Sequence, residues 1–117
     1  MSNDRQINYI ELPARDLDAV ERFYVAAFGW SFNDYGSEYR AFNDGNMDGG
    51  FYLADAASSA AKGAALVVLY AANLEATRET VLRCGGSLLR DIFGFPGGRR
   101  FHFADPNGNE LAVWSAK

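Results

Sequence analysis

Residues 99–114 read RRFHFADPNGNELAVW, in which two apolar-rich runs flank the turn-forming sequence DPNGN. Pro, Asn and Gly in close succession favour a turn, and alternating apolar residues on both sides are typical of half-buried strands. This stretch therefore predicts a hairpin made of a strand at 99–104 and a strand at 109–114.

The rest of the chain predicts elements in an order that occurs twice. Apolar residues at helical spacing follow Asp16 and Asn73, side chains of the type that caps a helix N-terminus, and glycines end both runs. The expected helices therefore lie between Asp16 and Gly29 and between Asn73 and Gly85. The expected strands lie at 7–12, 30–35, 38–42, 50–53, 64–71, 87–92, 99–104 and 109–114.

The two halves of the chain align with each other. Leu12, Asp16 and Gly29 of the first half correspond to Leu69, Asn73 and Gly86 of the second, and Asp44 corresponds to Asp105. The segment 93–98 (FGFPGG) has no counterpart, and it could form either a lid or an ordinary hairpin loop. An internal repeat of this kind predicts two similar units that bury their faces against each other.

The composition is that of a globular chain. The 117 residues are 49% hydrophobic, 15% aromatic and 22% charged, with a formal net charge of -4. A chain of this length can bury a core without disulfides or metal ions. Proteins that bind nucleic acid or anionic membranes need a basic surface, so we expect neither partner here.

Cys84 is the only cysteine, which excludes an intrachain disulfide and a CxxC pair. The opening MSNDRQINYI lacks the apolar segment of a signal peptide. The longest apolar stretch, 64–72, is shorter than the ~20 residues that span a bilayer. We therefore expect a cytoplasmic protein.

Three segments carry a family resemblance: ELPARDLDAVERFYVAAFGW at 11–30, GGFY at 49–52 and the hairpin at 99–114. Together they resemble the vicinal oxygen chelate superfamily, which includes glyoxalases, bleomycin-resistance proteins and ring-cleaving dioxygenases. The resemblance extends from about Ile7 to Trp114. One scaffold of this kind hosts many chemistries, so these motifs indicate the fold more strongly than the reaction.

The resemblance implies an α+β fold of two βαβββ modules that form an open, cup-shaped, eight-stranded sheet, with the helices on its convex side. We expect a single domain over 1–117, with module one at about 6–54, a linker at 55–63 and module two at about 64–115. Ligands of such proteins bind on the concave side. Short members commonly pair, so we also expect a homodimer.

Metal-dependent members of this superfamily take one His, Glu or Gln ligand from each of four strands, which suits a divalent ion with open positions. The resemblance places these positions at Tyr9, Phe51, Leu66 and Ala112. Phe, Leu and Ala side chains have no donor atoms for such an ion. We therefore predict no metal site and no cofactor.

We expect these positions to line the cup instead, together with residues of the closing hairpin. The candidate ligand-binding residues are Tyr9, Phe51, Leu66, Arg100, His102, Ala112 and Trp114. Trp30, Phe93 and Phe95 could add to an aromatic wall on which a planar ligand stacks.

His102 is the only histidine, and strand alternation places it on the cup side with Arg100. Glu11 is flanked by apolar residues, so an inward carboxylate would need a partner, which Arg100 or His102 could supply. A Glu–His pair can transfer a proton without a metal, which makes His102 and Glu11 the candidate catalytic residues. Alternatively, a neighbouring strand or solvent satisfies His102, and Glu11 is solvated or pairs with Arg15.

We therefore expect a metal-free protein that binds a small, partly aromatic organic molecule in the cup, for instance to sequester a toxic or antibiotic-like compound. The first alternative is a lyase, isomerase or dioxygenase-family enzyme that uses His102 and Glu11. The second alternative is a structural or regulatory subunit whose cup is filled by its own side chains or by a partner chain.

Overall fold

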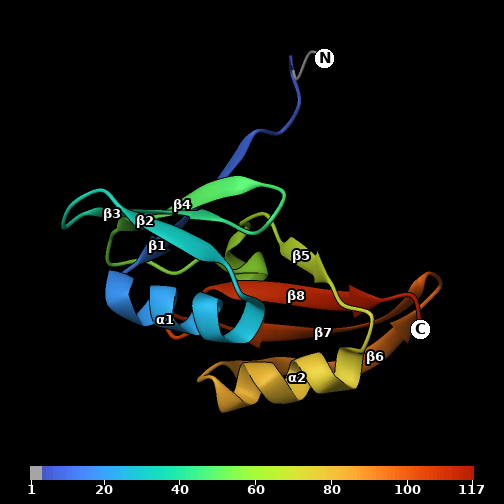
Figure 1. Ribbon diagram of the computed structural model, residues 1–117. Helices are drawn as coiled ribbons and strands as arrows, with labels where there is room; N and C mark the ends of the chain where they lie inside the picture. Colours follow the sequence, from blue (N-terminus) through green and yellow to red (C-terminus); the bar gives the residue numbers. More distant parts are fainter. Residues whose placement is uncertain (1–3) are drawn as a thin grey trace.

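Two βαβββ modules follow one another along the chain in this computed structural model, which describes residues 4–117 (Figure 1). Module one consists of β1 (Tyr9–Ala14), α1 (Leu17–Phe28), β2 (Ser31–Asp34), β3 (Tyr39–Asn43) and β4 (Asp48–Leu53). Module two consists of β5 (Val67–Tyr70), α2 (Leu74–Arg83), β6 (Ser87–Phe95), β7 (Gly98–Ala104) and β8 (Glu110–Ser115). A short 3-10 helix, η1 (Ala60–Lys62), lies in the linker. The predicted order of elements is confirmed.

Each module forms an open four-stranded sheet, with strand orders β1-β4-β3-β2 and β5-β8-β7-β6. The first strand of each module pairs in parallel with the last, and the remaining neighbours are antiparallel. The predicted α+β fold of paired βαβββ modules is therefore confirmed. Its strands are divided between two hydrogen-bonded sheets within the chain.

Both helices begin at the predicted caps. The Asp16 side chain accepts a hydrogen bond from the backbone N–H of Ala19 (3.2 Å), and the Asn73 side chain accepts one from Ala76 (3.0 Å). These bonds satisfy N–H groups that a helix N-terminus otherwise leaves unpaired. Gly29 ends α1 with a φ of 73°, a left-handed conformation that glycine adopts without strain.

The two sheets share one core, and α1 contacts both of them. On one side the Tyr24 ring lies 5.3 Å from that of Phe51 in β4. On the other side Phe23 and Phe28 lie 6.0 and 5.9 Å from Phe103 in β7. Both sheets therefore turn one face toward this core, and the opposite faces are directed away from it.

We call these opposite faces the free faces, and strand register assigns their residues. The free face of module one carries Tyr9, Glu11, Asn33, Tyr39, Ala41, Gly50 and Tyr52. The free face of module two carries Val68, Tyr70, Arg90, Phe93, Arg100, His102, Glu110, Ala112 and Trp114. They are the two surfaces available to form a cup.

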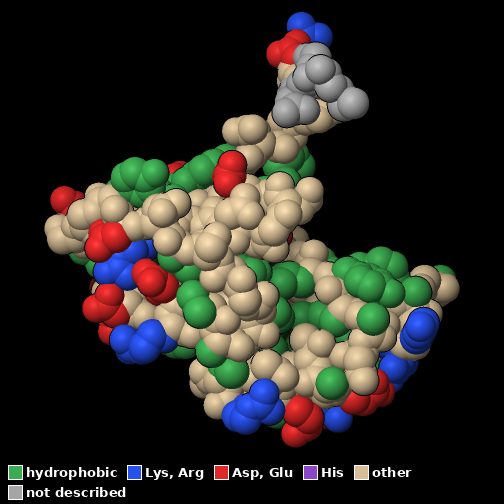
Figure 2. Space-filling model, viewed as in Figure 1, with side chains coloured by type: hydrophobic (Ala, Val, Ile, Leu, Met, Phe, Trp, Pro, Cys, Tyr) green, Lys and Arg blue, Asp and Glu red, His purple; other side chains and the backbone are tan. Residues whose placement is uncertain are grey.

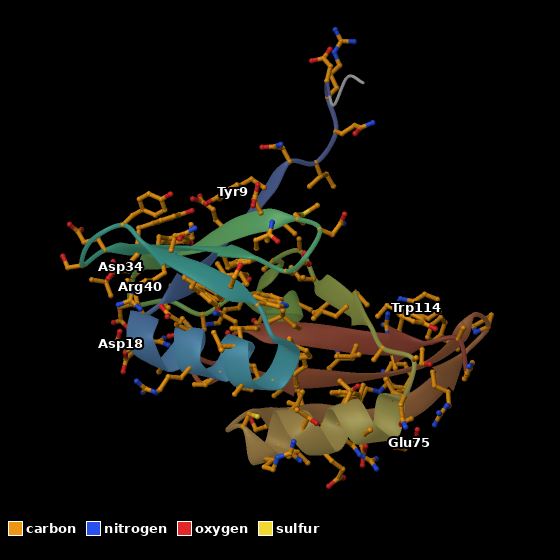
Figure 3. The ribbon with its side chains drawn as sticks, in the orientation of Figure 1. Tyr9, Asp18, Asp34, Arg40, Glu75 and Trp114 are labelled. Atoms are coloured by element: carbon orange, nitrogen blue, oxygen red, sulfur yellow. The ribbon has the colours of Figure 1, made fainter. Side chains whose placement is uncertain are left out.

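Arg40 of β3 shows independently which face of module one is covered by α1. Its guanidinium contacts Asp18 at 2.7 Å and Glu21 at 2.6 Å, both on α1, and Asp34 of β2 at 3.6 Å. Arg40, Asp18 and Asp34 lie together near the start of α1 in Figure 3. Since Arg40 pairs in register with Phe51, the Phe51 side of β4 faces the helix as well.

The DPNGN sequence joins the two modules. The buried Asp105 carboxylate accepts a hydrogen bond from the Tyr24 hydroxyl of α1 (2.8 Å) and another from the Asn109 amide (3.0 Å). The same amide donates to the backbone carbonyl of Pro13 in β1 (2.8 Å). Arg15 adds a bond from its backbone N–H to the Asn107 side chain (2.9 Å). These contacts link residues far apart in sequence, so the motif has a structural role.

Several boundaries differ from those predicted from the sequence. β6 continues to Phe95, so the segment 93–98 is the end of a strand and a tight turn at Pro96 and Gly97. β5 begins at Val67, later than predicted, because the linker extends further. No helix within residues 4–117 has the length and apolar character needed to cross a membrane.

Candidate functional site

Phe51 does not lie on the cup side, and the prediction that it does is wrong. The side chain is fully buried on the core face, and its ring lies 5.6 Å from that of Phe42. Its neighbours Gly50 and Tyr52 occupy the free face. The sequence could not fix this register, because Gly49 and Gly50 have no side chains from which to follow the alternation.

Trp30 is also a core residue, contrary to the expectation that it lines the cup. It is 6% exposed and stacks between Tyr24, at 4.4 Å, and Phe42, at 4.5 Å. The aromatic wall expected from the sequence is thus reduced to residues on the free faces.

Glu11 lies on the free face of module one, but its partner is not His102 or Arg100. The Tyr39 hydroxyl donates a hydrogen bond to Glu11 Oε2 (2.8 Å), and the Tyr9 hydroxyl lies 2.7 Å from that of Tyr39. Burial raises the pKa of Tyr39, and its hydrogen bonds to Tyr9 and Glu11 raise it further. Tyr39 therefore stays protonated and remains the donor to the carboxylate.

Gly50 makes this arrangement possible. A Cβ atom at this position would overlap the Tyr39 hydroxyl and ring. Tyr39 can therefore lie across β4 and reach Glu11 only because residue 50 is glycine. Arg15, the other partner considered for Glu11, pairs with Asp55 instead (2.7 Å).

His102 lies on the free face of module two, where its partner is Glu110 on the neighbouring strand. His102 Nδ1 is 2.9 Å from Glu110 Oε2, and Glu110 Oε1 accepts a hydrogen bond from the backbone N–H of Ala60 (2.9 Å). The bond to His102, followed by that from Ala60, lowers the pKa of Glu110. The carboxylate is therefore ionised at neutral pH, so His102 Nδ1 carries the proton that it shares.

The other ring nitrogen of His102 has no partner. The His102 side chain is 11% exposed, and its Nε2 atom is buried without a hydrogen bond among residues 4–117. Because buried polar atoms are normally paired, this nitrogen marks a position where a ligand group could bind. The pairing of Glu110 with His102 was missed, although strand alternation places both on one face.

Two irregularities in β6 bring further side chains to this face. The pairing of β6 with β7 shifts register between Leu88 and Arg90 and again between Arg90 and Phe93. As a result Arg90 pairs with His102 and Phe93 pairs with Arg100, so both β6 residues are on the free face. In a regular strand, residues three apart point to opposite faces. Bulges of this type often redirect side chains next to functional sites.

Arg90 and Arg100 both lie against aromatic rings. The Arg90 guanidinium carbon is 3.6 Å from the Phe93 ring centroid, and that of Arg100 is 5.3 Å from Phe93 and 5.7 Å from Phe95. Within the described part of the chain, neither guanidinium is hydrogen-bonded or ion-paired with an acceptor, and Arg100 Nε is buried. Both cations are therefore free to bind a ligand anion.

Trp114 adds an apolar region beside these cations. Its ring lies 5.0 Å from Tyr70, edge to face, and 6.2 Å from Phe95. We call Tyr70, Phe95 and Trp114 the aromatic patch. Figure 2 shows hydrophobic side chains gathered over the ends of β5 and β8, the region where Figure 3 labels Trp114.

The positions expected to hold a metal ion do not fit one. Ala112 lies between Val68 and His102 on the free face of module two, and Leu66 immediately precedes β5; neither side chain offers a donor. Tyr9 is hydrogen-bonded to Tyr39. Across residues 4–117, no group of three or more His, Cys, Asp or Glu side chains is placed to bind a metal. These positions therefore lack the set of donor side chains that the family resemblance implies for metal-dependent members.

The family model described as Glyoxalase/Bleomycin resistance protein/Dioxygenase superfamily matches residues 6–113 of this chain. A comparison with curated proteins finds no match.

Solved structures show similarity of fold over nearly the whole chain. A glyoxalase-related enzyme from Fulvimarina pelagi is 22% identical, with a TM-score of 0.79, covering 95% of this chain and 88% of that one. A glyoxalase/bleomycin resistance protein/dioxygenase family enzyme from Burkholderia phytofirmans PsJN is 14% identical, with a TM-score of 0.79 and coverages of 94% and 98%. The fosfomycin resistance protein FosX from Mesorhizobium loti is 16% identical, with a TM-score of 0.74 and coverages of 97% and 93%.

Proposed function

The chain belongs to the glyoxalase/bleomycin resistance protein/dioxygenase superfamily, and from that premise we propose that it binds a small, partly aromatic organic molecule on the free face of module two without a metal ion. The observation that carries this proposal is that buried polar atoms without hydrogen-bond partners lie next to aromatic side chains. His102 Nε2 and Arg100 Nε are buried without partners beside the aromatic patch. A ligand with both polar and aromatic groups would satisfy both features.

A homodimer would complete the cup. Large apolar side chains on both free faces are accessible in the single chain: Tyr9 is 41% exposed, Val68 43% and Tyr70 54%. Exposed apolar surface of this kind favours contact with another protein surface. We propose that the free face of module one in one protomer meets the free face of module two in its partner, so that each cup is built from two copies.

This binding function suits a protein that sequesters its ligand. One of the structurally similar proteins is named for fosfomycin resistance, which makes removal of a toxic or antibiotic-like compound a reasonable version of the proposal. The lone cysteine is compatible with the proposed cytoplasmic location, where disulfides are rare.

The binding proposal is tested by titrating the protein with 2-naphthol, a neutral planar probe, in ligand-observed NMR. We expect saturable binding to the wild-type protein and at least a fivefold weaker affinity in Trp114→Ala, because the indole is the largest ring of the patch. The control Val25→Ala removes an exposed apolar side chain on α1, away from the free faces, and should leave the affinity unchanged. Equal affinities of the Trp114→Ala and Val25→Ala variants would contradict the proposal.

A second candidate function is an enzyme that uses His102 with Glu110, in place of the predicted pair of His102 with Glu11. A carboxylate on Nδ1 orients the imidazole and leaves Nε2 as a general base or acid, which suits a metal-independent lyase or isomerase. If this holds, His102→Ala will abolish turnover of any substrate that is found, while 2-naphthol binding changes only a few-fold. Turnover that survives His102→Ala would exclude this second function.

A further inference from the structure

The free face of module two carries a local positive charge that the composition of the chain does not suggest. The whole chain has a net charge of -4, yet Arg90 and Arg100 lie on this face without an acceptor among residues 4–117. Glu110 is the only acidic side chain that register places there, and it is already bonded to His102.

The other acidic residues near this sheet are engaged on its helix side. Asp91 of β6 accepts a hydrogen bond from Arg78 of α2 (2.9 Å), and Glu75 of α2 pairs with Arg99. Arg99 lowers the pKa of Glu75 to about 2, as expected for a direct ion pair. The two faces of the sheet therefore differ in charge: the side of α2 carries ion pairs, and the free face carries cations that are not paired.

We propose that this face recognises an organic anion, specifically a planar aromatic carboxylate, whose charged group binds Arg100 and Arg90 and whose ring stacks in the aromatic surroundings. This inference rests on the proposed small-molecule binding and names the class of ligand. A guanidinium binds a carboxylate through paired, charge-assisted hydrogen bonds, which neither arginine makes within the described chain.

The backbone of β6 supports the proposal. Without its two register shifts, Arg90 and Phe93 could not both lie on the free face opposite His102 and Arg100. The shifts place a cation and an aromatic ring side by side, with the Phe93 ring 5.8 Å from that of His102. The carboxylate would therefore bind beside the planar rings of Phe93 and His102.

His102 supplies the third polar contact. Its Nε2 atom is buried and unpaired, while Nδ1 is held by Glu110. When the imidazole is neutral, Nε2 accepts a hydrogen bond, for example from a hydroxyl next to the carboxylate; when it is protonated, Nε2 donates to the carboxylate itself. Either state satisfies an atom that is otherwise unpaired.

The test compares benzoate with benzamide, its neutral analogue of nearly the same shape, by ligand-observed NMR at neutral pH and constant ionic strength. We expect the wild-type protein to bind benzoate about tenfold more tightly than benzamide, since only benzoate pairs with a guanidinium. Arg100→Gln should remove this preference. The matched control is Arg99→Gln, which alters the adjacent arginine on the opposite side of the strand and should keep it.

The remaining outcomes distinguish failure of the anion inference from failure of the proposed small-molecule binding. If benzamide binds the wild-type protein as tightly as benzoate, or if Arg100→Gln keeps the preference, the anion inference is wrong, while saturable binding of 2-naphthol would leave the proposed function standing. If benzoate, benzamide and 2-naphthol all fail to bind, both proposals are wrong. If Arg100→Gln does not fold, Arg90→Gln decides, and an unchanged preference in that variant overturns the inference.

Discussion

Replacing Asp105 with alanine is expected to lower the free energy of unfolding by roughly 3 to 5 kcal/mol, because several buried hydrogen-bond donors lose their acceptor at once. The Asp105 carboxylate accepts bonds from the Tyr24 hydroxyl, the Asn109 side chain and the backbone N–H groups of Asn107 and Asn109. Three of these donors lie in the DPNGN turn, and the fourth belongs to α1 of the other module. The loss is measured by urea denaturation of the variant and the wild-type protein.

The internal repeat provides the matched control. Asp44 corresponds to Asp105 in the repeat and also accepts bonds from its own turn, from the N–H groups of Asn46 and Met47, but it is exposed. Asp44→Ala should lower the free energy of unfolding by about 1 kcal/mol or less, since water can replace the lost acceptor. A similar cost at both positions would show that Asp105 acts only as a turn residue and does not join the modules.

Phe51→Ala is expected to lower the free energy of unfolding by roughly 3 to 4 kcal/mol, as for other large-to-small substitutions in a packed core. The Phe51 ring is fully buried and contacts those of Tyr24, Phe32 and Phe42. The cavity left behind would lie between β4 and α1, where the backbone of a central strand limits collapse.

Tyr52→Ala is the control for this substitution, because Tyr52 is the next residue on the strand and is 40% exposed on the free face. This substitution should lower the free energy of unfolding by about 1 kcal/mol or less in the same denaturation experiment. A larger cost for Tyr52→Ala than for Phe51→Ala would reverse the faces of β4 and, with them, the composition of the free face of module one.

The fold could be predicted because its signals are local and occur twice. Helix caps at Asp16 and Asn73 and a turn-forming sequence before the last strand each depend on a few adjacent residues. The faces of β7 and β8 were also predicted correctly, because the alternation of side chains is unbroken in both strands. Phe101 and Phe103 lie in the core, while Arg100 and His102 are on the free face, as an unbroken alternation requires.

The site could be predicted only in part, because alternation fails at two places. The glycine pair before Phe51 removes the side chains that would have fixed the register of β4. The register shifts of β6 place Arg90 on the free face, whereas an unbroken alternation from Ser87 would place it on the core face, so the cation nearest to Phe93 was not identified. Irregularities of this kind depend on tertiary pairing and have no simple sequence signal.

The partners of Glu11 and His102 show a further limit of the sequence. Both residues were correctly assigned to faces that could line a cup, and the sequence suggested that they pair with each other. In the structure Glu11 accepts a bond from Tyr39 within module one, and His102 pairs with Glu110 within module two. Alternation assigns a residue to a face, but the positions of two sheets relative to each other depend on how α1 packs between them.

We propose that two copies of this chain form a cup that binds an organic molecule without a metal ion. Native mass spectrometry of gently purified protein tests this claim most directly, because one spectrum reports the oligomer and any bound species. We expect a species of twice the 12.8 kDa chain mass, either bare or carrying an organic adduct. A monomer at all protein concentrations, or one tightly bound transition-metal ion per chain, would contradict it.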